Sequence, residues 1–190
     1  MGLADYETIR ERFRDRIIAE KKLRRVQVGA NVCALFENRD TVLLQIQEML
    51  RTERITRPAA VEHEINTYSE ILPGDDQLSC TVMIEIPNTV ERDAFLRAAV
   101  GFEGHVWLVA DGERIKAIPT AHGGELEDRT TAVHYLKFDL PKALADALRA
   151  SGSGSMPRPK VELEVDHPAY SARAALSDAT VAELSEDLRS

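Results

Sequence analysis

The sequence predicts a single α+β domain over residues 1–190, with an antiparallel sheet and helices packed mainly on one face of it. Several segments carry apolar residues at steps of three and four, as amphipathic helices do, and others alternate apolar and polar residues, as half-buried strands do. No regular helical crossover separates the predicted strands, which indicates antiparallel pairing. A chain of 190 residues has the length of one domain with one hydrophobic core.

The first half of the chain predicts three helices and two strands. In order, these are a helix over 6–23, a strand over 26–36 broken at Gly29, a helix after Asp40, a helix over 58–72 and a strand over 78–86. Asn38 or Asp40 caps the second helix, because a short side-chain oxygen can accept from the free amides of the first turn. Pro58 suits a helix start, and Pro73-Gly74 ends the third helix.

The apolar residues of the first and third helices predict which faces are buried. The expected inward positions are Tyr6, Ile9, Phe13 and Ile17 in the first helix and Val61, Ile65, Tyr68 and Leu72 in the third. Each set recurs at three- and four-residue steps, so its members lie on one helical face. Glu20 and Arg24 continue the first face and are spaced to form an ion pair with each other.

The second half predicts shorter elements. They are a helix over 89–100, a hairpin of strands 106–110 and 114–118, a loop over 120–131, a strand over 132–140, a helix over 142–150, a strand over 161–165 and a helix over 177–188. Asp111-Gly112 is a strong hairpin signal, since both residues tolerate the positive φ of a two-residue turn. The stretch SGSGSMPRP predicts a flexible connector near 151–159, which leaves a C-terminal strand and helix within 160–190.

Composition and charge exclude several classes of function. The formal net charge of −8 disfavours nucleic acid or an anionic membrane as the main partner, because phosphate binding needs a positive surface. No apolar run has the length of a membrane span, and no apolar segment of a signal peptide begins the sequence. Cys33 and Cys80 form no metal-binding or disulfide spacing and are predicted to be small buried side chains. We therefore expect a cytoplasmic protein, and the frequency of twofold assemblies favours a homodimer.

Two carboxylates and one histidine form the strongest candidate site. Glu53 and Glu64 fall on or beside apolar helix faces, and His134 falls on the apolar face of its strand. Such groups need partners when buried, and a divalent metal can be the partner; oxygen and imidazole ligands suit iron, manganese or zinc. Tyr68 or Arg51 would then contact the ligands without binding the metal. Internal ion pairs with neighbouring side chains explain the same pattern more simply.

A basic run at the end of the first helix is a candidate anion site. Arg24 and Arg25 follow two lysines there, and Arg51 could join them around a small anion. The preferred interpretation is a solvated helix end, since cations are stabilised at helix C-termini.

Motifs for nucleophilic catalysis and phosphate binding do not occur in the sequence. Trp107 lies between apolar neighbours and is predicted to be a core residue. Asp166-His167-Pro168 is predicted to form a turn, because the proline forces His167 into an extended conformation.

Several runs resemble a bacterial protein family of unknown function. They are RRVQVG, FENRDT, QIQEMLRTERI, LSCTVMIEI, VHYLKF and DHPAY, and together they span nearly the whole chain. The resemblance implies genes that often neighbour those for rubrerythrin and an iron–sulfur oxidoreductase, and hence a rubrerythrin-like or iron–sulfur partner. It implies no site residues. Two hypotheses follow: an accessory or interaction protein of a redox or oxidative-stress system, or a metal-dependent oxidoreductase or metal sensor. The first is preferred.

Overall fold

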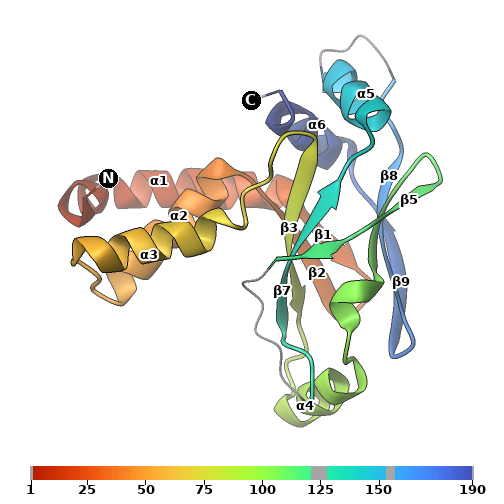
Figure 1. The fold of residues 1–190 in the computed structure, drawn as a ribbon, viewed down its shortest axis with the longest axis horizontal. Helices are drawn as coiled ribbons and strands as arrows, with labels where there is room; N and C mark the ends of the chain where they lie inside the picture. Colours follow the sequence, from red (N-terminus) through yellow and green to blue (C-terminus); the bar gives the residue numbers. More distant parts are fainter. Residues whose placement is uncertain (1, 121–127, 153–156, 190) are drawn as a thin grey trace.

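The computed structural model describes residues 2–120, 128–152 and 157–189 of the chain (Figure 1). In chain order, its elements are α1 (Leu3–Arg24), β1 (Arg25–Val28), β2 (Val32–Glu37), α2 (Arg39–Thr52), α3 (Pro58–Ser69), β3 (Gln77–Ile84), α4 (Thr89–Ala98), the 3₁₀ helix η1 (Phe102–His105), β4 (Val106–Ala110), β5 (Glu113–Lys116), β6 (Ile118–Pro119), β7 (Val133–Asp139), α5 (Lys142–Gly152), β8 (Val161–His167), β9 (Tyr170–Ala175) and α6 (Asp178–Asp187). These described elements confirm the predicted α+β class.

The strands form two antiparallel sheets instead of one. The first has the strand order β1-β2-β3-β7-β6, and the second has the order β5-β4-β8-β9. We call the two sheets, with α4, η1, α5 and α6, the sheet body. Helices α1, α2 and α3 project from the body, as Figure 1 shows, and we call them the helical arm.

Contacts at two edges join the sheets to each other. Between β5 and β6, the amide of Ala117 donates to the carbonyl of Val106 over 3.0 Å, so one extended segment passes from the second sheet into the first. At the opposite edge, the hydroxyl of Tyr170 donates to the carbonyl of Val28 over 2.6 Å. It also accepts from the amide of Asn31 over 3.2 Å. Gly29 allows this approach, because its φ of 73° suits glycine and a β-carbon there would overlap Tyr170 and Ala172.

The main core lies inside the sheet body. Alternate residues of both sheets point into it, and α5 and α6 cover one end; its most completely buried side chains include Phe36, Phe102, Leu108, Leu136, Phe138, Leu148, Leu163 and Leu184. Along β7 and β8, buried residues alternate with more exposed ones, as the alternation in their sequences predicts for strands with one apolar face.

The helical arm has smaller cores of its own. Helix α2 lies between the other two: Val42, Ile46 and Leu50 face Tyr68 and Ile71, and Leu44 faces Tyr6 and Ile17 of α1. The predicted burial of Tyr6, Ile17 and Tyr68 is confirmed. The predicted burial is wrong for Ile9 and Ile65, whose side chains are 37% and 43% exposed. Helices α1 and α3 each pack against another helix of the arm on one side only, so part of their apolar face stays at the surface.

Three further differences from the sequence prediction concern a hairpin, an additional strand and the extent of two predicted connecting segments. The segment over 26–36 is a hairpin of β1 and β2, since Gly29 reverses the chain direction there. Strand β9 was not predicted, because alanines occupy its inward positions and weaken the apolar alternation. Residues 121–127 of the predicted loop and 153–156 of the predicted connector lie outside the described residues, while Ser151 and Gly152 complete α5.

Candidate functional site

His134 is buried in the sheet body, as its place in the alternating pattern of β7 predicts. Its side chain is 6% exposed and lies against the ring of Phe102, at a centroid distance of 5.3 Å. Nε2 is 3.3 Å from the hydroxyl of Thr130, and Nδ1 is 3.7 Å from a carboxylate oxygen of Glu103. Burial lowers the pKa of His134, and the nearby Glu103 only partly opposes this effect. The ring is therefore neutral at neutral pH.

The other two predicted metal ligands lie in the helical arm. Glu53 caps the C-terminus of α2, and Glu64 lies on the side of α3 that carries Tyr68. Among the described residues, no group of three or more His, Cys, Asp and Glu side chains could hold a metal ion. The structure thus does not bring Glu53, Glu64 and His134 together into such a group.

The predicted supporting residues also have other surroundings. The Nε atom of Arg51 donates to Glu7 of α1 over 2.6 Å, at the surface of the arm. Tyr68 belongs to the core between α2 and α3, and burial raises its pKa. Both side chains contribute to packing within the helical arm.

Arg24 lies in a buried ion-pair cluster and has no open face for an anion. Only 2% of its side chain is exposed. Its Nη1 atom lies 2.5 Å from Asp187, and its Nη2 atom 3.2 Å from Glu183, both on α6. Its Nε atom is 3.0 Å from Glu20, an ion pair without a hydrogen bond. The i, i+4 pair of Glu20 and Arg24 is thus present as predicted, and the guanidinium is enclosed by three carboxylates.

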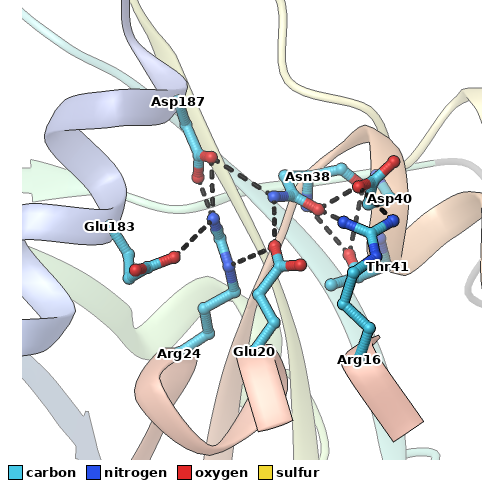
Figure 2. Close-up of polar contacts among 8 residues, drawn as sticks. All are labelled: Arg16, Glu20, Arg24, Asn38, Asp40, Thr41, Glu183 and Asp187. Carbon is cyan, nitrogen blue, oxygen red and sulfur yellow. Dashed lines mark hydrogen bonds and ion pairs between the residues drawn. The ribbon is translucent and has the colours of Figure 1, made fainter. Parts of the chain in front are cut away.

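Asn38 connects this cluster to α2, as Figure 2 shows. Its Oδ1 atom accepts from the amides of Asp40 and Thr41, which caps the helix as predicted. Its Nδ2 atom donates to Glu20 over 2.7 Å and to Asp187 over 3.3 Å. One network therefore ties α1, α2 and α6 together at the point where the helical arm meets the sheet body. We call it the Arg24 network.

Arg25, the second predicted anion-binding residue, lies apart from Arg24. Its Nη1 atom is 3.5 Å from Glu85, and both side chains are about half exposed. The three arginines of the predicted anion site, Arg24, Arg25 and Arg51, thus each pair with different acids.

A second polar cluster lies on the outer face of the β5-β4-β8-β9 sheet. Asp166 accepts from the indole of Trp107 over 2.9 Å and from Arg114 over 2.5 Å, and it lies 3.3 Å from Nδ1 of His105. The guanidinium of Arg114 stacks on the Trp107 ring at 4.1 Å from the ring centroid. Hydrogen bonds from Arg114 first, and then from Trp107, lower the pKa of Asp166 to about 2. This carboxylate stays ionised at neutral pH.

Sequence reasoning missed this cluster because it ended the strand at residue 165. Strand β8 continues to His167, so Glu162, Glu164 and Asp166 alternate outward along it. Continuing the alternation to Asp166 would have placed it on the same outward face as Glu164, which the structure pairs with Trp107 of β4. Trp107 is a partly buried residue of this outer face.

The arm contains a third cluster that joins α1 to α2. Glu48 accepts two hydrogen bonds from Arg10, over 2.8 and 2.7 Å, and one from the hydroxyl of Tyr6 over 2.6 Å. The Arg10 bonds lower the pKa of Glu48 to about 2, and the Tyr6 bond adds to the effect. Every carboxylate oxygen of Glu48 is therefore engaged in holding the two helices together.

Both cysteines are buried, as predicted. Burial raises the pKa of the Cys33 and Cys80 thiols, most strongly for Cys80, which is fully enclosed in the main core. A raised pKa disfavours the reactive thiolate. Both residues pack as small side chains among the buried hydrophobic residues.

These features define an α+β protein of two antiparallel sheets with a projecting helical arm. The chain belongs to the family described as "Protein of unknown function (DUF3501)", whose profile matches residues 1–188. It is similar to a solved structure, that of a novel protein of unknown function from Burkholderia pseudomallei K96243. The two share 32% sequence identity with a TM-score of 0.88, over 99% of this chain and 95% of that one. Curated proteins give no significant match.

Proposed function

We propose that this chain is a non-catalytic accessory protein that binds a protein partner in a bacterial redox or oxidative-stress system. The observation that carries the proposal is the shape of the fold: a helical arm with its own cores projects from the sheet body and is fixed to it by the Arg24 network. A rigid projection of this kind increases the surface that a partner can contact.

The chemistry of the described residues supports a binding role. Both oxygens of the Glu48 and Asp166 carboxylates accept hydrogen bonds from neighbouring side chains, and the thiols are buried. Within the described part of the chain, no helix combines the length and apolar character needed to cross a bilayer. Two unpaired cysteines fit a reducing compartment, so the proposal places the protein in the cytoplasm.

The acidic surface of the sheet body is the proposed docking surface for the partner. Outside the helical arm, residues 25–38 and 71–190 carry 13 bases and 21 acids, whereas residues 1–24, which contain helix α1, carry seven bases and five acids. Charge complementarity speeds association and suppresses wrong partners. The proposed partner is a rubrerythrin-like or iron–sulfur protein with a basic face, as the family resemblance implies.

Titration of the full chain with the purified rubrerythrin-like or iron–sulfur protein encoded beside its gene tests the proposal. Isothermal titration calorimetry is expected to show a complex that weakens as salt is added, because exposed charges are screened. Glu91→Lys and Glu113→Lys change exposed acids of the sheet body and should weaken the complex. Glu62→Lys makes the same charge change on the helical arm and should not. Absence of binding to either partner at low salt would refute the proposal.

A further inference from the structure

We draw no further inference here: the strongest candidate, the side-chain cluster of Thr130, His134 and Glu103 where β7 meets η1, belongs to the candidate site already described, and nothing among the described residues shows how a ligand would reach Thr130 and His134, which are 7% and 6% exposed.

Discussion

Replacing Arg24 by methionine is expected to destabilise the protein more than any change to a surface arginine. The substitution keeps the length of the side chain but leaves three carboxylates without a cation, and these are only 17%, 30% and 14% exposed. Removing one partner of a buried ion pair costs about 3–5 kcal/mol. Because Glu183 is partly solvated, we expect a loss near the lower limit, about 3 kcal/mol. For a chain of this length, that lowers the thermal midpoint by about 6–12 °C.

Urea unfolding followed by circular dichroism measures this loss, and two further variants separate its causes. Arg24→Lys keeps the charge but loses the two parallel bonds to Asp187, so its loss should be smaller than that of Arg24→Met. Arg25→Met removes a neighbouring arginine from an exposed pair and should cost less than about 1 kcal/mol. If Arg24→Met stayed within about 1 kcal/mol of the native chain, the Arg24 network would not be what fixes the arm to the body.

Three further predictions follow from other parts of the fold. Glu48→Gln removes a carboxylate whose pKa falls from 4.5 to about 2 on folding, so its stabilising effect exists above pH 4.5 and is lost as the pH falls toward about 2. Urea unfolding should show a destabilised variant at neutral pH that approaches the native chain in acid; a constant difference would contradict the assignment. Gly29→Ala should lower the thermal midpoint more than Tyr170→Phe, since it adds a steric overlap and a strained positive φ of 73° to the lost contact. An equal midpoint for the two variants would refute this. Dialysis against a chelator should leave the midpoint unchanged, because the described residues include no group of three or more potential ligands placed for a metal; stoichiometric iron, manganese or zinc by elemental analysis would contradict this.

Local features of the sequence predicted local structure well. Asp111-Gly112 forms the turn between β4 and β5, Asn38 caps α2, and Glu20 pairs with Arg24 one turn later. In each case the interacting groups lie within four residues, so the chain itself brings them together. The inward position of His134 follows for the same reason, because side chains alternate along a strand whatever the strand packs against.

The candidate sites depended on contacts that spacing does not reveal. The metal prediction combined residues of two helices and a strand, and the fold places the helices in an arm and the strand in the sheet body. Tyr6, Arg10 and Glu48 form a cluster across 38 or more residues that no local pattern indicated.

The sequence by itself determined the type and order of most helices and strands, which side of each strand is apolar, and the caps and turns between them. Only the tertiary structure decided that the strands divide into two sheets, that three helices form an arm, and that Arg24 meets Glu183 and Asp187, 159 and 163 residues away. The physical reason is the range of the interactions. Capping, alternation and i, i+4 pairing act along the chain, whereas a buried guanidinium is stabilised by whichever carboxylates the packing of distant elements brings to it.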